Sequence, residues 1–331
     1  MVHVGAMSLT IWCNTKFNEP AQARLEEGTK KHRLVMSRSA SASVLVAGQA
    51  DPELAEADIA LGQPDAAQCL ALPNLKWVEV TSAGYTRYDT AEFKETMRER
   101  GSYFTNMSGV FADPCAQHAL AMILALGRQL PQSLRDQLEG PRWEYAQRRY
   151  DSVMLTGQTI LILSYGAIAK RLVELLAPFR MKIYALRRSA RSEPGVHIIA
   201  EERLSAVLPE IDHVVNILPD NEATQNYINA RRLSHFKKGA KFYNIGRGTT
   251  VDQKALQEAL ESGRLDSAYL DVTDPEPLPP DHPLWRTRNC FITPHTAGGR
   301  RDQDEAIVEH FLENLAALER EEPDAMTDRV V

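Results

Sequence analysis

Residues 160–169 read Ile-Leu-Ile-Leu-Ser-Tyr-Gly-Ala-Ile-Ala, an apolar run followed by a short turn and the start of a helical pattern. A strand that turns directly into a helix is the setting of a dinucleotide-binding loop, because the first backbone N–H groups of the helix can bind a pyrophosphate. Gly166 stands where the backbone must approach the phosphates, and Ala169 is tolerated where the helix packs on the strand. Ser164 departs from the pattern, since glycine usually makes this turn, and a strained backbone costs about 1–3 kcal/mol. For this stretch alone, an ordinary strand-turn-helix remains the alternative.

The same alternation of short apolar runs and helical patterns continues through the chain and predicts parallel sheets with helices on their faces. After Gly157 the predicted strands are 159–163, 181–186, 213–217, 240–244, 267–272 and 290–292, and the predicted helices are 168–178, 201–207, 229–235, 252–263 and 302–320. In the first hundred residues, we predict strands at 9–12, 43–47 and 77–80 and a helix at 20–33. Asp113 and Pro114 look like the N-cap and first position of a long helix from 115 to about 138. We expect the tail after Glu321 to be loose.

Composition narrows the class of protein. The chain has 331 residues, enough for about two domains, and its net charge of -6 argues against a nucleic-acid-binding surface. We see no signal peptide at the start and no apolar run that approaches the roughly 18 residues of a membrane span, so we expect no membrane partner. The four cysteines are scattered, which favours reduced structural thiols in a cytoplasmic protein over a metal or disulfide framework.

The end of the second predicted strand bears on cofactor choice. An NAD enzyme usually presents an acidic residue here to the ribose hydroxyls, about 20 residues beyond the glycine-rich loop. This chain has Leu186, which cannot accept a hydrogen bond from the 2'-hydroxyl, followed by Arg187, Arg188 and Ser189, which could bind a 2'-phosphate. NADP is therefore favoured and NAD stays possible, with a solvated basic turn as the alternative interpretation.

Three residues that follow the predicted nucleotide-binding loop in the chain are candidates for catalysis. Arg247 lies in Tyr-Asn-Ile-Gly-Arg-Gly (243–248), Glu276 in Leu-Asp-Val-Thr-Asp-Pro-Glu-Pro (270–277) and His295 in Phe-Ile-Thr-Pro-His-Thr-Ala-Gly-Gly (291–299). A fixed cation can hold a carboxylate and polarise a carbonyl, a histidine can transfer a proton, and a carboxylate can orient the histidine ring. Together they suit the reduction of a 2-keto acid once a hydride donor is bound.

These frames resemble those of the D-isomer-specific 2-hydroxyacid dehydrogenase family. The resemblance runs from about Leu72 to Gly299 and includes Trp-Val-Glu-Val-Thr-Ser-Ala-Gly-Tyr (77–85), Val-Phe-Ala-Asp-Pro-Cys-Ala-Gln-His (110–118) and Leu-Pro-Asp-Asn-Glu-Ala-Thr (218–224). Ser-Ala-Gly (82–84) and Pro-Pro-Asp-His-Pro-Leu-Trp (279–285) are similar to the glyoxylate/hydroxypyruvate reductase branch. The family implies two doubly wound α/β domains, Rossmann-like and flavodoxin-like, with the active site between them. The NAD(P)-binding domain, 107–299, would be inserted into a substrate domain of 1–106 plus 300–331, and the protein would be a homodimer built largely on the cofactor domain.

The resemblance also implies roles for individual residues. His295 would donate the proton with Glu276 as its partner, Arg247 would hold the substrate, and backbone amides at Ala83, Gly84 and Tyr85 would bind its carboxylate. Asp271 would meet the nicotinamide amide, Val110 would lie near the nicotinamide, and Leu218 and Pro219 would lie beside the adenosine. The full set expected to bind cofactor is Val110, Ser164, Tyr165, Gly166, Ala167, Ile168, Leu186, Arg187, Arg188, Ser189, Leu218, Pro219, Ile245, Gly246, Arg247, Asp271 and His295. No metal is expected, and Gln117 departs from the glutamate usual before the histidine of this family.

The expected reaction transfers a hydride from NADPH to C2 of a small 2-keto acid, with glyoxylate or hydroxypyruvate as first candidates. One alternative is a dinucleotide-sensing protein like the dehydrogenase-related co-repressors, since Ser164 could weaken cofactor binding. Formate dehydrogenase is disfavoured, because that branch pairs its histidine with glutamine, whereas this chain has Glu276.

The remaining histidines and tryptophans are expected to serve the fold. We read His118 as a packing residue of the connecting helix, His213 and His235 as structural and His282 as a turn residue. Trp143 is expected to pack in the inter-domain arm, with reach into a partner's active site as the alternative, and Trp285 borders the substrate pocket or simply packs.

Overall fold

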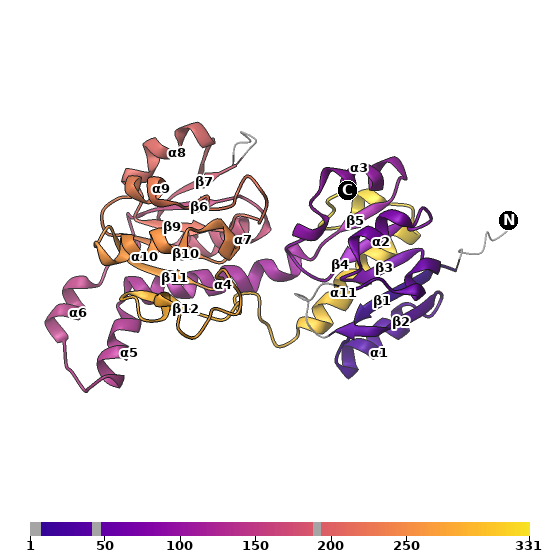
Figure 1. The fold of residues 1–331 in the computed structure, drawn as a ribbon, viewed down its shortest axis with the longest axis horizontal. Helices are drawn as coiled ribbons and strands as arrows, with labels where there is room; N and C mark the ends of the chain where they lie inside the picture. Colours follow the sequence, from indigo (N-terminus) through magenta and orange to yellow (C-terminus); the bar gives the residue numbers. More distant parts are fainter. Residues whose placement is uncertain (1–7, 42–47, 188–192) are drawn as a thin grey trace. The chain divides into compact units, whose positions relative to one another are not determined.

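The computed structural model describes residues 8–41, 48–187 and 193–331. The chain forms two compact units, Met1–Phe111 with Arg300–Val331, and Ala112–Gly299 (Figure 1). Each unit is built on one sheet whose paired strands are all parallel. The predicted fold class, two doubly wound α/β domains, is confirmed.

The first unit contains a five-stranded sheet in the order β2-β1-β3-β4-β5. The direction of winding reverses between β1 and β3, and ligands of such sheets bind beyond the carboxyl ends of the strands at this switch point. Its strands are β1 Thr10–Thr15, β2 Arg33–Ser41, β3 Ile59–Gly62, β4 Trp77–Val80 and β5 Tyr103–Thr105, and its helices are α1 Glu19–Gly28, α2 Ala66–Ala71, α3 Ala91–Glu99 and α11 Gln303–Glu319. Helix α11 comes from the far end of the chain and packs on this sheet, with Phe311 stacked on Trp77 at 5.1 Å between ring centroids.

In this unit the sequence predicted strands β1 and β4 and helix α11, whose ends lie within three residues of the prediction, and missed most of the other elements. Strand β4 lies at the predicted residues, whereas the helix predicted at 20–33 ends at Gly28. Strands β2, β3 and β5 had no prediction, and the strand predicted at 43–47 lies outside the described residues. The reason is that β3 is a four-residue run buried on both faces, which has no alternation to detect, while β2 is rich in serine and arginine.

The C-terminal tail is ordered, so the expectation of a loose tail is wrong. The amide of Val330 donates to the carbonyl of Phe104 at 2.8 Å, and the amide of Asn106 donates to the carbonyl of Asp328 at 3.1 Å. Strand β5 ends its sheet and would otherwise expose unpaired backbone groups, which the tail satisfies.

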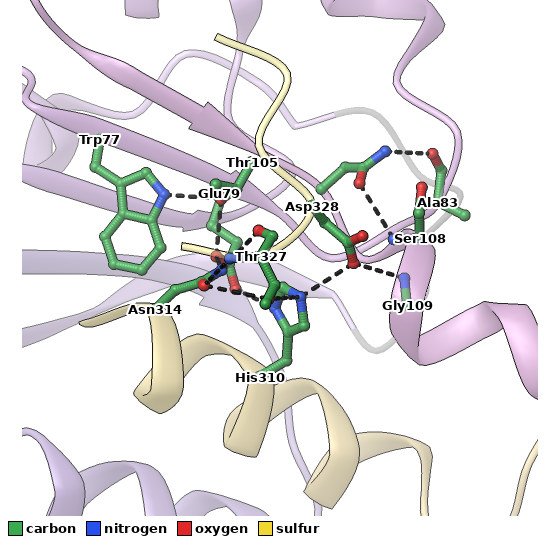
Figure 2. A network of polar contacts seen from close by, with 11 residues as sticks. Trp77, Glu79, Ala83, Thr105, Ser108, Gly109, His310, Asn314, Thr327 and Asp328 are labelled. Carbon is green, nitrogen blue, oxygen red and sulfur yellow. Dashed lines mark hydrogen bonds and ion pairs between the residues drawn. The ribbon is translucent and has the colours of Figure 1, made fainter. Parts of the chain in front are cut away.

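Beneath the tail, Glu79, His310 and Asp328 form a polar cluster that joins β4, α11 and the tail (Figure 2). Glu79 is fully buried and accepts from His310 Nδ1 at 3.2 Å, while His310 Nε2 lies 3.1 Å from Asp328 Oδ2. Burial alone would lower the pKa of His310, but the hydrogen bonds and charges of the two carboxylates raise it to about 9. Asn314 and Thr105 also donate to Glu79, each at 2.8 Å. The cluster therefore ties the last residues of the chain to its first hundred.

The second unit contains a seven-stranded sheet in the order β12-β11-β10-β9-β6-β7-β8, which reverses between β6 and β9. This is the strand order of dinucleotide-binding α/β sheets, extended by one strand. Its strands are β6 Thr159–Leu163, β7 Lys182–Leu186, β8 Val196–Ile199, β9 His213–Asn216, β10 Ala240–Asn244, β11 Leu265–Leu270 and β12 Cys290–Ile292. Its helices are α5 Leu130–Leu138, α6 Tyr145–Asp151, α7 Ala167–Leu176, α8 Glu201–Val207, α9 Ala230–His235 and α10 Gln253–Glu261, and α4 Ser108–Gly127 runs from the first unit into the second.

All six strands predicted after Gly157 are present, with ends within two residues of the prediction, and only the short edge strand β8 had no prediction among the described residues. The long helix predicted from 115 to about 138 is wrong in both its start and its length. Helix α4 begins at Ser108, so Pro114 lies inside it, and Gln129 at φ 59° separates it from α5. A proline near the first turns removes one helical hydrogen bond, and α4 tolerates this loss. The side chain of Asp113 does not cap a helix there but accepts from Arg171.

Among the described residues, α4 is long and apolar enough to cross a membrane by length and composition alone. The expectation that nothing approaches this length is therefore wrong, because the 20 residues of α4 include Asp113 as their one Asp, Glu, Lys or Arg. Core helices of water-soluble proteins pass the same test, so α4 by itself assigns no membrane.

Candidate active site

The nucleotide loop joins β6 to α7 at the switch point of the second sheet. Ser164 has φ 84°, in the left-handed region that favours glycine, as the departure from the loop pattern predicted. Gly166 is the N-cap of α7, and no side chain of the described residues caps this end. Within the described part of the chain, a Cβ at Gly166 would meet no atom within 4 Å beyond its own chain neighbours, so the packing of these residues does not require glycine there. Uncapped amides beside open space fit a bound pyrophosphate.

Of the four residues predicted to select the cofactor, the structure describes two, Leu186 and Arg187, at the end of β7. Leu186 is buried, and the guanidinium of Arg187 pairs with Glu193 at 3.1 Å between Nη1 and Oε1. Arg188 and Ser189 lie outside the described residues. Burial raises the pKa of Tyr165 in the nucleotide loop, the charge of Glu193 adds to this, and Arg187 opposes it. The sequence did not indicate Glu193, which lies beyond the basic turn.

Further predicted cofactor residues follow β9 and β10, on the other side of the switch point. Leu218 and Ile245 are buried and Pro219 is exposed. A Cβ on Gly246 would lie 2.8 Å from the carbonyl oxygen of Leu218, so these two loops approach each other closely. Of the remaining loop residues, Ala167 and Ile168 are in the first turn of α7, and Ala169 is fully buried against the sheet.

The backbone of Arg247 is held by a buried polar network that the sequence did not indicate. Its carbonyl accepts from Asn244 Nδ2 at 3.0 Å and from Thr250 Oγ1 at 2.6 Å. Asn216 in turn donates to both Asn244 and Thr250, at 3.0 and 2.7 Å. Burial lowers the pKa of the Arg247 guanidinium, and the negative charges of Glu276 and Asp220 oppose this shift. Because an arginine stays protonated in proteins, a fixed positive charge results.

His295 and Glu276 form the contact that the sequence predicted. The distance between His295 Nδ1 and Glu276 Oε2 is 2.8 Å, and Glu276 Oε1 accepts from the amide of Thr273 at 3.0 Å. Burial alone would raise the pKa of Glu276, but the hydrogen bonds from His295 and Thr273 and the charge of Arg247 lower it overall. Glu276 is therefore ionised at neutral pH, and it engages Nδ1 of the His295 ring rather than Nε2.

Gly248 allows the loop of Arg247 to approach the loop of Glu276. A Cβ on Gly248 would lie 1.9 Å from the carbonyl oxygen of Thr273, so no side chain fits between the two loops. The glycine beside Arg247 therefore has a steric role in bringing the cation close to Glu276.

The loop that carries His295 is fixed by Asp271, which is buried at the end of β11. Its carboxylate accepts from Thr293 Oγ1 at 2.5 Å and from the amides of Thr296 and Ala297, both at 2.9 Å. His295 itself has φ 54°, and its amide donates to the Asp271 carbonyl at 2.8 Å. A non-glycine residue in this region costs about 1–3 kcal/mol, which the contacts of Asp271 offset. Asp271 thus positions the histidine, and its contact with a nicotinamide amide stays a prediction.

His118 joins this region from α4 through polar contacts. Its Nε2 hydrogen-bonds to the hydroxyl of Tyr269, which also contacts Thr293, and it lies 3.8 Å from Asp271 Oδ1. Burial lowers the pKa of His118, although the charge of Asp271 opposes this. His118 is therefore held next to the loop of His295 by its hydrogen bond to Tyr269.

Four predicted site residues, Ala83, Gly84, Tyr85 and Val110, belong to the first unit, and the others that the structure describes belong to the second. The Ala83–Gly84–Tyr85 stretch follows β4, and the carbonyl of Ala83 accepts from Asn106 Nδ2 at 2.9 Å (Figure 2). Val110 is buried in the third position of α4.

The remaining histidines, tryptophans and cysteines that the sequence analysis considered can be compared with the structure one by one. His213 is buried between Tyr243 and Gln158, and its pKa falls to about 4 because of burial, so the structural interpretation is confirmed. His282 accepts from the amide of Leu284 in a turn, as predicted. Trp143 is 93% exposed, so the expectation that it packs in the inter-domain arm is wrong. The indole of Trp285 donates to the Pro279 carbonyl. All four cysteines are buried and unpaired.

The second unit thus brings together a nucleotide loop, a half-buried cation and a histidine–carboxylate pair. Comparison with known proteins identifies the class. The sequence profile of the D-isomer specific 2-hydroxyacid dehydrogenase, NAD binding domain, matches residues 120–297. A glyoxylate reductase of Korarchaeum cryptofilum is 33% identical over 271 residues, 79% of this chain and 79% of the relative.

Solved structures agree with that family. A D-isomer specific 2-hydroxyacid dehydrogenase of Xanthobacter autotrophicus Py2, in complex with NADPH and MES, superposes with a TM-score of 0.81 at 26% identity, covering 98% of each chain. An NADPH-dependent glyoxylate/hydroxypyruvate reductase of Sinorhizobium meliloti, in complex with NADP and malonate, has a TM-score of 0.70 at 25% identity and covers 94% of this chain and 93% of its own. The chain therefore belongs to the D-isomer specific 2-hydroxyacid dehydrogenase family and is an NAD(P)-dependent dehydrogenase.

Proposed function

We propose that this dehydrogenase reduces glyoxylate or hydroxypyruvate to the D-2-hydroxy acid and prefers NADPH to NADH. The contact between His295 and Glu276 at 2.8 Å, on loops adjoining that of Arg247, carries the choice of reaction. The choice of substrate rests on the likeness to glyoxylate reductases and to the Sinorhizobium meliloti enzyme.

In the proposed reaction, Arg247, His295 and Glu276 of the second unit each have a separate role. A bound reduced nicotinamide dinucleotide supplies the hydride that is added to C2. Arg247 holds the substrate's carboxylate and keto oxygen, and its charge stabilises the alkoxide that forms as the carbonyl bond is reduced. His295 donates the proton on Nε2 to this alkoxide oxygen, because its Nδ1 is engaged by Glu276. Glu276, ionised at neutral pH, engages His295 Nδ1 and fixes the orientation of the ring.

The preference for NADPH is proposed from the end of β7. Leu186 offers no acceptor for the ribose 2'-hydroxyl, while Arg187 presents a guanidinium suited to a 2'-phosphate. Glu193 already pairs with Arg187, so the 2'-phosphate would either displace Glu193 from the guanidinium or share the guanidinium with it.

We further propose that the protein is a cytoplasmic homodimer. Helix α5 exposes Leu130, Leu134 and Leu138 at helical spacing on one face, and Trp143, Tyr145, Tyr150 and Met154 nearby are also exposed. A stripe of this kind is typical of an interface. Buried, unpaired cysteines agree with a reducing compartment.

The test follows the absorbance of reduced nicotinamide with purified protein, NADPH or NADH, and a panel of 2-keto acids. We expect turnover of glyoxylate and hydroxypyruvate with a lower KM for NADPH. His295→Asn should lower kcat by a factor of about 10²–10⁴, the usual contribution of a general acid, and leave cofactor affinity nearly unchanged. His235→Asn, an exposed histidine of α9, is the matched control and should retain full activity.

Two results would contradict the proposal. Normal turnover in His295→Asn would remove that residue from the mechanism, and a preference for NADH would remove the role of Arg187. Tight cofactor binding without turnover of any acid would instead favour a dinucleotide-sensing protein, for which the strained Ser164 at φ 84° gives one structural reason.

A further inference from the structure

Gln63 occupies the switch point of the first sheet, directly after β3. Asn14, near the end of the neighbouring β1, holds its backbone from both sides. Asn14 Oδ1 accepts from the amide of Gln63 at 2.7 Å, and Asn14 Nδ2 donates to its carbonyl at 3.0 Å. Gln63 is therefore fixed where ligands of such sheets bind.

The side chain of Gln63 connects Arg87 to the Ala83–Gly84–Tyr85 loop, which the family resemblance implies would bind the substrate's carboxylate. Gln63 is only 5% exposed, and its Oε1 accepts from Arg87 Nη1 at 3.2 Å. Its Nε2 donates to Ser82 Oγ at 3.1 Å, and Ser82 Oγ donates to the Gly84 carbonyl at 2.7 Å. The buried amide thus sets the distance between an exposed guanidinium and the Ala83–Gly84–Tyr85 loop.

We propose that Arg87 determines substrate specificity by binding an oxygen substituent on C3 of the 2-keto acid. This inference rests on the proposed function, and on the role that the family resemblance implies for the Ala83–Gly84–Tyr85 loop, whose amides would hold the C1 carboxylate together with Arg247. A guanidinium only donates hydrogen bonds, so it favours a hydroxyl or carboxylate oxygen and gains nothing from a methyl group. Among acids of similar size, hydroxypyruvate is then preferred to pyruvate, and glyoxylate, which has no C3, is indifferent to Arg87.

The experiment compares kcat/KM for hydroxypyruvate, pyruvate and glyoxylate in the wild type and in Arg87→Met and Arg87→Lys. Loss of one hydrogen bond from a charged donor at an exposed site should lower the hydroxypyruvate-to-pyruvate ratio about tenfold in Arg87→Met. Glyoxylate reduction should change little, and Arg87→Lys should keep part of the ratio because lysine still donates. Arg98→Met, an exposed arginine on α3, controls for the loss of one positive charge from the same unit. An unchanged ratio in Arg87→Met would overturn the inference.

A second measurement separates this inference from the proposed function. The dissociation constants of hydroxypyruvate and pyruvate are measured by calorimetry on the protein saturated with NADP⁺, where no reduction occurs. If no acid is turned over but Arg87→Met loses the binding preference, the proposed function fails and the inference stands. Equal preferences in the wild type and Arg87→Met, or no binding of either acid, would overturn the inference whatever the turnover.

Discussion

Raising the pH from 6 to 10 should selectively weaken the first unit, because His310 must lose a proton that two carboxylates hold in place. Its Nδ1 faces Glu79 and its Nε2 faces Asp328, at 3.2 and 3.1 Å. Both ring nitrogens can donate only when the imidazole is protonated. Deprotonation therefore leaves one of two carboxylate contacts without a donor, and the carboxylate of Glu79 is fully buried.

The size of the effect follows from the shift in pKa. The pKa of His310 rises from 6.5 to about 9 in the folded protein. Each unit corresponds to about 1.4 kcal/mol, which gives about 3 kcal/mol in total. Because the folded state binds the proton more tightly than the unfolded state, this stabilisation is complete below about pH 6.5 and is lost as the pH rises through about 9. That is a large share of the 5–15 kcal/mol typical of a folded domain, roughly speaking.

Urea unfolding monitored by tryptophan fluorescence can isolate this unit. Trp12 and Trp77 lie buried in the first unit, whereas Trp143 and Trp285 belong to the second and are exposed. In a Trp143→Phe, Trp285→Phe background, the emission then reports only the first unit. The matched variant is His310→Gln, which keeps a polar side chain but cannot titrate.

The free energy of unfolding should fall by about 3 kcal/mol more between pH 6 and pH 10 in the parent than in His310→Gln. Parallel curves for the two proteins would refute the reasoning, since they would show that other groups cause the pH dependence.

Three further changes test other parts of the structure. Ser164→Gly should add about 1 kcal/mol to the unfolding free energy by removing a side chain from φ 84°. It should also tighten NADPH binding in a fluorescence titration, and an unchanged Kd would mean that the turn accepts serine without strain. Gly248→Ala should lower kcat/KM by about tenfold or more, because its Cβ would lie 1.9 Å from the Thr273 carbonyl and displace Arg247; wild-type activity would disprove the steric role. Leu138→Glu should turn a dimer into a monomer in sedimentation velocity, and a persistent dimer would place the interface elsewhere.

The second unit was largely predictable from sequence because its signals are local. Each buried strand is a compact apolar run bounded by turn residues, and β6 leads directly into the loop of Gly166. Glu276 and His295 each lie in a short sequence motif of the family. Their contact, across 19 residues, could therefore be predicted from the resemblance.

The other features of the fold and the site depend on contacts between residues far apart in the sequence, which no local pattern encodes. Asp271 was expected at the cofactor, which stays a prediction, but nothing in the sequence indicated that its carboxylate also binds the loop of His295 through Thr293 and two backbone amides. Gln63 follows a four-residue strand with no alternation, so nothing in the sequence indicated its position beside Arg87. The tail looked loose because its partner, β5, lies more than 200 residues earlier in the chain.

The pairing of the tail with β5 has a consequence for how the protein is made. The second unit, Ala112–Gly299, is continuous in sequence, so it can fold while the ribosome is still adding the final segment. The first unit must wait, because two of the partners of its buried Glu79, His310 and Asn314, lie on α11, which follows the whole second unit in the chain. During that interval the nascent first unit carries an unpaired sheet edge at β5 and a Glu79 carboxylate that lacks its donors from α11, which makes it the part of the chain that most needs protection from aggregation during synthesis.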